Sequence, residues 1–319
     1  MDRRTHSSPR QFLLLLLAAA AAFAVFVFVL KAATGPGGKA PRVPERLARP
    51  ALVHHRVRQP IHRFRAGHER HPRPPLASLA SNITFCPILM YHYIRAYTNQ
   101  ADPIGIGLSV APRVFKHEMQ YIHTHHFHTV TIAQLARHIL YGKPLSRHPV
   151  ALTFDDGYRD QFTKALPVLR HYHLTATFFI VSGFVNQPRY MTWRQVRETD
   201  RAGIEIGVHT IHHFDLTLLT PWQEWREIDH SKMVIERHLG HPATVFAYPS
   251  GAFNQQALID VRKAGYLASV STLPGTLNAQ PTIDYLFRVE ILGEYPPATM
   301  ESYLTSRFGT PFEPTPMAP

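Results

Sequence analysis

The stretch that decides the fold is Val150-Ala151-Leu152-Thr153-Phe154-Asp155-Asp156-Gly157-Tyr158. Its first five residues are apolar or β-branched, which is typical of a short buried strand. Two adjacent carboxylates follow, and burying them is costly unless a metal, a charge or hydrogen bonds compensate. In barrels and open α/β sheets, catalytic groups collect at the carboxyl ends of strands. An ordinary Asp-Asp-Gly turn is the alternative, so the choice depends on what the chain brings to these aspartates.

Strands and helices alternate on both sides of this stretch. Beside 150–154, strands are predicted at 85–93, 129–131, 176–181, 204–208, 244–248, 266–271 and 287–292. Helices are predicted at 114–126, 132–140, 161–171, 193–202, 221–239 and 255–264, and a polar loop at 102–105. This alternation favours a parallel α/β sheet curled into a barrel.

The first 80 residues have a different composition. Residues 12–30 carry no charged or polar side chain, and a helix needs ~20 such residues to cross a bilayer. We expect residues 1–11 to be a cytoplasmic basic N-terminus, 12–30 a signal anchor, 31–80 a disordered basic, Pro-rich linker, and 81–319 the folded domain outside the cytoplasm. A cleaved signal peptide, followed by secretion, is the alternative, because small residues follow at Ala32 and Ala33.

The formal net charge of +12 lies mostly in the residues before the predicted domain. Residues 31–75 contain eleven Lys or Arg against Glu45 and Glu69, and the chain outside the first 75 residues is nearly neutral. No base-reading motif accompanies the charge, so we expect no nucleic-acid partner. The basic segment is interpreted as a solvated linker, or as one that lies against anionic lipid or wall polymer. The single cysteine, Cys86, cannot form an internal disulfide, so the core must hold the domain together.

A histidine pair follows the predicted strand 204–208, in His209-Thr210-Ile211-His212-His213. His209 and His213 are four residues apart, so one helical turn places both imidazoles on one side. Two histidines and one carboxylate are a recurrent ligand set for a catalytic metal. The chain has 22 histidines, so such spacings also arise by chance. This pair, however, shares with the aspartates a place directly after a buried strand, and we therefore predict a metal site.

The adjacent aspartates can have separate roles. Successive side chains of an extended chain point to opposite sides, so one aspartate can bind the metal while the other faces water. A metal lowers the pKa of a water molecule that it binds, and a nearby carboxylate can accept its proton.

Thr153-Phe154-Asp155-Asp156-Gly157, followed by His209-Thr210-x-x-His213, resembles the first two motifs of polysaccharide deacetylases, the NodB-homology family (carbohydrate esterase family 4). The similarity extends from about residue 87 to residue 292. It implies a distorted (β/α) barrel and a divalent metal, most often Zn²⁺, with Co²⁺, Ni²⁺ and Fe²⁺ as alternatives. It also implies that Asp156, His209 and His213 bind the metal and that Asp155 is the general base.

Two family motifs are altered here. The third usually reads Arg-x-Pro-Tyr, but Ala247 and Ser250 replace its arginine and tyrosine. The resemblance implies that the backbone N–H at Ser250 still helps to hold the oxyanion, because a backbone group survives side-chain replacement. Arg288 is a candidate to orient Asp155 in place of the missing arginine.

The usual carboxy-terminal Leu-x-His, which supplies the general acid, is also absent. The segment Pro87-Ile88-Leu89-Met90-Tyr91-His92 resembles an element of poly-N-acetylglucosamine deacetylases that carries this histidine near the start of the domain. That resemblance makes His92 the candidate acid, with a packed first-strand histidine as the alternative. Trp193 and Tyr248 are candidates to line the sugar site, although aromatic residues in such places are as often part of the core.

These features predict a membrane-anchored, metal-dependent enzyme that removes acetyl groups from an N-acetylhexosamine polysaccharide outside the cell. An O-acetyl esterase on the same scaffold is the nearest alternative, since ester and amide hydrolysis pass through similar intermediates. A glycosidase fits less well, because its two carboxylates flank the bond from separate positions. A non-catalytic polysaccharide-binding or wall-binding module is the alternative from a different functional class.

Overall fold

The structure is a computed structural model that describes residues 83–309. The predicted cytoplasmic segment 1–11, anchor 12–30 and linker 31–80 lie outside these residues, as do residues 310–319. Within residues 83–309, no helix combines the length and the apolar character that crossing a membrane requires.

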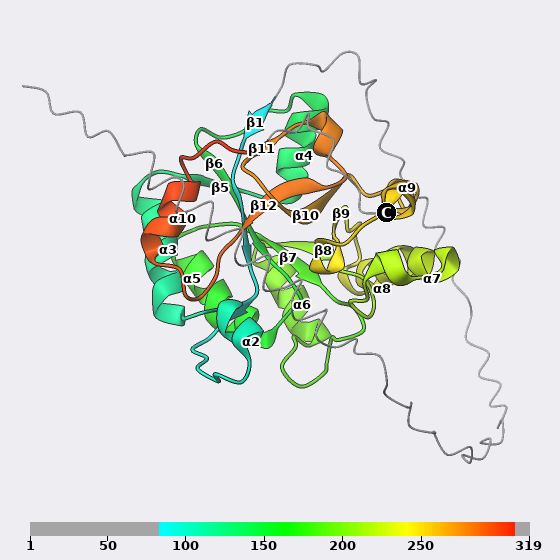
Figure 1. The fold of residues 1–319 in the computed structure, drawn as a ribbon, viewed down its shortest axis with the longest axis horizontal. Coiled ribbons are helices and arrows are strands. Elements are labelled where there is room, and N and C mark those ends of the chain that lie inside the picture. The colour runs from blue at the N-terminus through cyan, green and yellow to red at the C-terminus, as the bar shows by residue number, and fades with distance from the viewer. Residues whose placement is uncertain (1–82, 310–319) are drawn as a thin grey trace, which may run out of the picture. The chain divides into compact units, whose positions relative to one another are not determined.

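A ring of parallel strands forms the centre of the fold (Figure 1). The main sheet has eight strands, and β5 (His128–Val130) pairs only with β6 at its edge. The other seven close into a barrel because β2 also pairs with β6. Their order is β2 (Ile88–Tyr91), β12 (Leu286–Glu290), β10 (Ala268–Pro274), β9 (Val245–Ala247), β8 (Glu205–Val208), β7 (Thr177–Ile180) and β6 (Pro149–Phe154). The predicted (β/α) barrel is therefore confirmed.

Helices lie between most of these strands along the chain, whereas β10 and β12 are joined through β11 (Leu277–Asn278) and a 3₁₀ turn. The helices are α3 (Pro112–Thr124), α4 (Ile132–Tyr141), α5 (Leu166–His171), α6 (Trp193–Arg201), α7 (Pro221–Trp225), α8 (Ser231–Leu239) and α9 (Gln255–Lys263). A Thr-x-x-Gln capping box begins each of α4, α6 and α7, in which the threonine hydroxyl accepts from the backbone N–H of the glutamine and the glutamine side chain accepts in return. Gly142 and Gly240 end α4 and α8 in the left-handed conformation, as helix stops commonly do.

Several predicted elements differ in detail. The expected strand 85–93 is three short ones, β1 (Thr84–Phe85), β2 and β3 (Tyr93–Ile94), in which β1 pairs with β11 (Leu277–Asn278) and β3 with β4 (Ser109–Val110). The expected polar loop at 102–105 contains α2 (Pro103–Gly107), which Asp102 caps by accepting from the Gly105 N–H. A further helix, α10 (Pro297–Tyr303), was not predicted.

The predicted helices 161–171 and 221–239 each contain a π-helical turn, at Gln161–Ala165 and at Arg226–His230. Such wide turns are rare and often occur at functional sites. Helical periodicity does not reveal them, because the inserted residue shifts the pattern by only one position.

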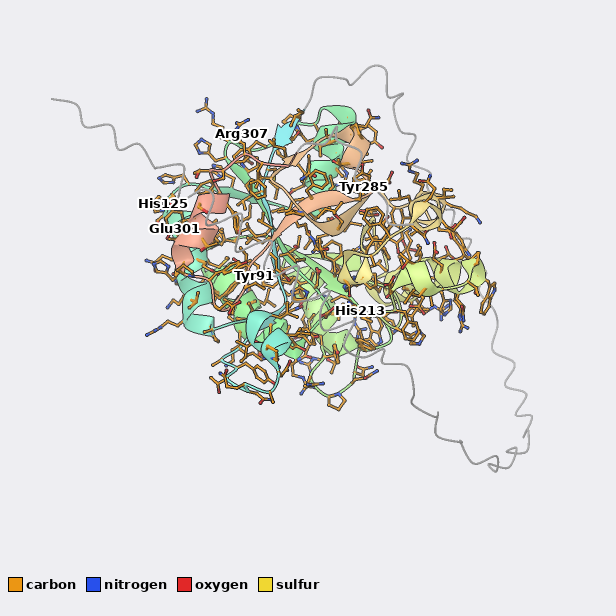
Figure 2. The ribbon with its side chains drawn as sticks, in the orientation of Figure 1. Tyr91, His125, His213, Tyr285, Glu301 and Arg307 are labelled. Atoms are coloured by element: carbon orange, nitrogen blue, oxygen red, sulfur yellow. The ribbon has the colours of Figure 1, made fainter. Side chains whose placement is uncertain are left out.

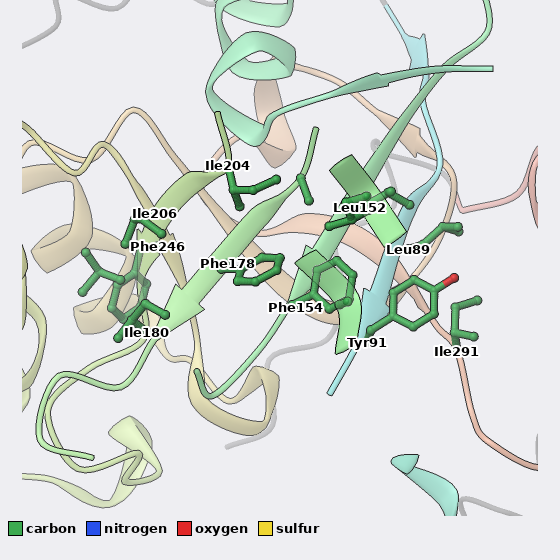
Figure 3. Close-up of a cluster of buried hydrophobic side chains, with 14 of the residues drawn as sticks. Leu89, Tyr91, Leu152, Phe154, Phe178, Ile180, Ile204, Ile206, Phe246 and Ile291 are labelled. Carbon is green, nitrogen blue, oxygen red and sulfur yellow. The ribbon is translucent and has the colours of Figure 1, made fainter. Parts of the chain in front are cut away.

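Alternate residues of β6 face different layers of the core. Leu152 and Phe154 belong to a large apolar cluster shared with the neighbouring strands and the outer helices, which Figure 3 shows in part. Ala151 belongs to a second cluster. Because side chains alternate along a strand, Thr153 and Asp155 follow Ala151 onto the same face. The aspartate at the end of β6 is thus directed to the side of the strand opposite Phe154.

The buried carboxyl group of Glu118, on α3, is expected to make the stability of the fold depend on pH. The Tyr91 hydroxyl donates to Glu118 Oε2 at 3.1 Å. Burial raises the pKa of Glu118 to about 7, although the hydrogen bond from Tyr91 opposes this shift. The folded state therefore holds this proton more tightly than the unfolded state, and its stability falls as the pH rises from about 4.5 to about 7.

We expect Glu118→Gln to remove this loss, because the amide is neutral at every pH and still accepts from Tyr91. The gain in the free energy of unfolding at pH 8 is of the order of 3 kcal/mol, and it shrinks toward zero near pH 4. Urea unfolding of both proteins at the two pH values measures it. Equal stability of the two proteins at pH 8 would contradict the prediction.

Candidate active site

Three predicted metal ligands converge at the carboxyl ends of two strands. Asp156 follows β6, while His209 and His213 lie directly after β8. Asp156 Oδ1 is 3.4 Å from His209 Nε2 and 3.4 Å from His213 Nε2. Candidate ligand atoms of all three residues lie within 4.8 Å of one another, and among the described residues no other group of this kind occurs. His213 is labelled in Figure 2.

The donor atoms in this cluster suit a divalent metal. Two ligands at about 2.0–2.1 Å from a tetrahedral Zn²⁺ are about 3.4 Å apart, which is the separation of Asp156 Oδ1 from each imidazole. The same Oδ1 is buried without a hydrogen-bond partner in the described part of the chain, as expected of an atom that serves as a ligand. His209 Nδ1 lies 2.8 Å from the Ala247 carbonyl oxygen. A carbonyl only accepts, so Nδ1 carries the proton and the Nε2 lone pair faces the cluster.

The backbone at these ligands is unusual. Asp156 has φ 74°, Thr210 has φ 64° and His213 has φ 58°. Such left-handed conformations cost roughly 1–2 kcal/mol each for residues with a side chain. They persist only where surrounding contacts hold them, so both loops are held in place by their neighbours.

Asp155 is held by Arg288, as the sequence suggested. Arg288 Nη1 and Nη2 donate to Asp155 Oδ1 and Oδ2, both at 2.8 Å, in a bidentate pair. Arg288 Nε also donates to the Ser271 carbonyl oxygen at 2.7 Å, and Nη1 donates to Thr153 Oγ1 at 3.2 Å. Both charged side chains are almost completely buried. Arg288, which comes from β12 and not from the third motif, is thus paired with Asp155, and its role in orienting a general base stays a prediction.

The two aspartates remain ionised for different reasons. Burial alone would raise the pKa of Asp155, but the Arg288 guanidinium outweighs it, so this pKa lies below its ordinary value. For Asp156, burial is likewise outweighed, by the neighbouring imidazoles of His209, His92 and His213, and its pKa is also lowered. The site thus presents two carboxylates of distinct environment, one beside an arginine and one between histidines.

His92 follows the strand that pairs with β6. It stands in the gap between β2 and β3, and the Asp155 N–H donates to the carbonyl oxygen of the preceding Tyr91 at 2.9 Å. His92 Nδ1 is buried and has no hydrogen-bond partner among the described residues. Gln161, fully buried on the π-helical turn Gln161–Ala165, donates through Nε2 to the His92 carbonyl oxygen at 3.0 Å and to the Asp155 carbonyl oxygen. One side chain therefore links the backbones that carry the predicted acid and the predicted base.

Tyr248 does not line a sugar site, contrary to the sequence prediction. It is fully buried, and its hydroxyl donates to the Asp284 carbonyl oxygen at 2.9 Å. Tyr248 lies two residues beyond Phe246 and joins the same apolar cluster, in accordance with strand alternation. Trp193 is partly buried and stacks on His238 with ring centroids 3.8 Å apart, so it packs α6 against α8. Its contact with sugar stays a prediction.

Ser250 lies after β9, within a short 3₁₀ turn at Pro249–Gly251. Its side chain is exposed and its φ is 52°. The oxyanion role of its N–H stays a prediction. Phe214, the residue after the ligand His213, has an exposed side chain whose ring stacks on His212 with centroids 5.2 Å apart. Reasoning from the sequence did not single out this residue.

Comparison with known proteins identifies related sequences. A family model described as polysaccharide deacetylase matches residues 142–269, a range that includes Asp155, Asp156, His209 and His213. The Bacillus subtilis protein named "Putative polysaccharide deacetylase YxkH" is 33% identical over 205 residues, which cover 64% of this chain and 71% of that protein. The peptidoglycan-N-acetylmuramic acid deacetylase PdaA of B. subtilis is 31% identical, over 50% of this chain and 60% of its own length.

The poly-beta-1,6-N-acetyl-D-glucosamine N-deacetylase of Escherichia coli K12 is 26% identical, over 58% of this chain and 34% of its own length. Among solved structures, the Streptococcus pyogenes deacetylase PplD in complex with acetate has a TM-score of 0.66 and 25% identity, covering 70% of this chain and 100% of that chain. IcaB from Ammonifex degensii has a TM-score of 0.59 and 20% identity, covering 69% of this chain and 95% of that chain. The likeness to IcaB is one of fold.

Proposed function

This chain belongs to the polysaccharide deacetylase family, and from that premise we propose that it hydrolyses acetamide groups of an N-acetylhexosamine polysaccharide, releasing acetate and leaving a free amine on the sugar. One observation carries the proposal. Asp156, His209 and His213 converge on one point, directly beside a carboxylate that Arg288 holds in a bidentate pair. A ligand set next to a separately held base is the arrangement that hydrolysis of an amide requires.

Each of these residues has a task in the proposed reaction. Asp156, His209 and His213 would hold a divalent metal, for which Zn²⁺ is the best fit, and that ion would act as a Lewis acid and lower the pKa of water. Asp155 accepts a proton from the attacking water, and Arg288 keeps that carboxylate oriented and charged. His92 donates a proton to the leaving nitrogen. The Ser250 N–H donates a hydrogen bond to the oxyanion that forms at the acetyl carbon.

Separate observations support the proposed substrate and the proposed location of the enzyme. The named activities of two relatives concern peptidoglycan N-acetylmuramic acid and poly-β-1,6-N-acetylglucosamine, which supports an N-acetylated polymer as substrate. Exposed Phe214, next to His213, offers a ring on which a sugar can pack. The apolar run at 12–30 supports anchoring in the cell membrane with the domain outside the cytoplasm.

Acetate release by the full-length chain tests the reaction and its substrate. We expect release from poly-N-acetylglucosamine, peptidoglycan or chitin oligomers, and none from acetylated xylan. Release from xylan alone would favour the O-acetyl esterase alternative. Shorter chains among the products would indicate a glycosidase. No release from any substrate, together with retention on the polymer, would support the binding module.

Removal of the metal gives a second expected outcome. Dialysis against a chelator should abolish acetate release, since Asp156, His209 and His213 then have no shared ion to present to the substrate. Addition of Zn²⁺, Co²⁺, Ni²⁺ or Fe²⁺ in separate samples should restore it and rank the metals. Full activity after exhaustive chelation, verified by elemental analysis, would exclude the metal-dependent mechanism.

A further inference from the structure

The loop that follows β8 carries both histidine ligands, and two of its residues have strained backbone conformations. Thr210 and His213 both adopt positive φ. Part of the restraint comes from the loop after β7, where the Ser182 and Gly183 N–H groups donate to the carbonyl oxygens of Thr210 and Ile211, each at 3.0 Å. A Cβ at Gly183 would lie 2.4 Å from the Ile211 carbonyl oxygen, so this approach needs glycine. One side of the loop is thus held by backbone contacts.

The opposite side of the loop is held by a single buried carboxylate. Glu227 Oε2 accepts from the backbone N–H groups of Ile211 and His212, each at 2.9 Å. Glu227 Oε1 contacts His212 Nδ1 at 2.7 Å. Glu227 is only 5% exposed. Its two oxygens therefore bind three donors from adjacent residues, all within the segment that separates His209 from His213.

Glu227 reaches the loop from an irregular part of its helix. It lies in the π-helical turn Arg226–His230, between α7 and α8. The Ser231 hydroxyl donates to the Glu227 carbonyl oxygen at 2.6 Å, which satisfies a backbone acceptor inside the widened turn. π-Helical turns of this kind are costly in a regular helix and often occur next to functional groups. The second such turn, at Gln161–Ala165, likewise brings a buried side chain, Gln161, to the site.

We propose that Glu227 is a positioning residue of the metal centre, which fixes the loop 210–213 so that His209 and His213 face Asp156. The proposal rests on the metal site of the proposed function. The proposal also gives His212 a role, although His212 is not a ligand. Its imidazole Nδ1–H donates to Glu227 and thereby orients the carboxylate that holds the loop. Outer partners of metal ligands commonly govern metal affinity in this way.

The test measures metal binding directly, with no substrate present. Full-length wild type, Glu227→Ala and Glu227→Gln are stripped of metal, and Zn²⁺ affinity is determined by competition with a chromophoric chelator. We expect the Kd of Glu227→Ala to rise about 10–100-fold. Glu227→Gln keeps an oxygen for the two backbone N–H groups but turns a donor toward His212 Nδ1–H, so its Kd should rise less, in the same direction.

The matched control is Glu236→Gln, on the adjoining α8. Glu236 forms an ion pair with Lys232 at 2.8 Å and accepts from the Ala243 N–H, but it contacts no residue of the ligand loop. The Glu236→Gln variant should lose a little thermal stability and keep the wild-type Kd for Zn²⁺. Hydrogen exchange adds a second readout, since only the Glu227 variants should expose the Ile211 and His212 amides.

Four outcomes decide the proposal. A raised Kd in both Glu227 variants, with wild-type affinity in Glu236→Gln, supports it. An unchanged Kd in Glu227→Ala overturns it and leaves the proposed function intact. A parallel rise in Glu236→Gln also overturns it, because the effect would then come from general destabilisation. Absence of binding of Zn²⁺, Co²⁺, Ni²⁺ and Fe²⁺ by wild type overturns both the positioning role and the metal-dependent function.

Discussion

Replacing Arg288 with methionine is expected to lower the free energy of unfolding by about 3–5 kcal/mol and to remove nearly all acetate release. The guanidinium makes four hydrogen bonds, two to Asp155 and one each to Ser271 and Thr153. Methionine fills much of the same volume but provides no donor. The Asp155 charge then stays buried without a partner, and this uncompensated charge accounts for most of the loss. Asp155 also loses its orientation and its lowered pKa.

Urea unfolding and acetate release by the full-length chain measure the two effects. The double variant Arg288→Met/Asp155→Asn removes both charges, so it should regain much of the lost stability while staying inactive. Arg262→Met is the matched control, since Arg262 on α9 also pairs with a buried carboxylate, Asp284, at 2.5 Å, but is half exposed and is not one of the proposed site residues. It should keep its activity. Near-wild-type activity in Arg288→Met would contradict the supporting role.

The barrel and the centre of the site were predictable because their signals are local in sequence. Asp155 and Asp156 follow an apolar strand, and His209 and His213 follow another, so each pair could be recognised within a few residues. Closure of the sheet then brings the ends of β6 and β8 together by way of β7. Arg288 could be proposed only through the family resemblance, since 133 residues separate it from Asp155.

Reasoning from the sequence missed residues whose contacts lie far away along the chain or depend on irregular backbone. Glu227 and Gln161 lie on helices, where a polar residue ordinarily indicates an exposed face, and only π-helical turns direct them inward. Tyr248 was misassigned because every residue of 245–248 is apolar or aromatic. Such a strand shows no alternation, so its sequence does not reveal which side chains face the core.

Replacing His92 with glutamine is expected to lower kcat on the acetylated polymer by about 10²–10⁴-fold, the range typical of a lost general acid. His92 follows β2, which pairs with the strand that ends before Asp155, and its Nδ1 is buried without a partner in the described part of the chain. Burial of an unpaired polar atom is unfavourable, and protonation of a leaving nitrogen would give the imidazole a partner during the reaction. Glutamine is similar in size but cannot transfer a proton at neutral pH. His117→Gln, an exposed histidine on α3, is the control.

A comparison of substrates with different leaving groups distinguishes a general acid from a residue that only supports the fold. An amide nitrogen must be protonated before the carbon–nitrogen bond breaks, whereas a nitrophenolate leaves an acetate ester without a proton. His92→Gln should therefore lose far more activity on the polymer than on 4-nitrophenyl acetate, while Asp155→Asn, which lacks the base needed for attack on both, should lose heavily on each. An equal loss on the two substrates would assign His92 to positioning instead. A selective loss on the amide would show that His92, after β2, is the general acid. It would then replace the histidine of the missing carboxy-terminal motif and complement the base, Asp155, after β6.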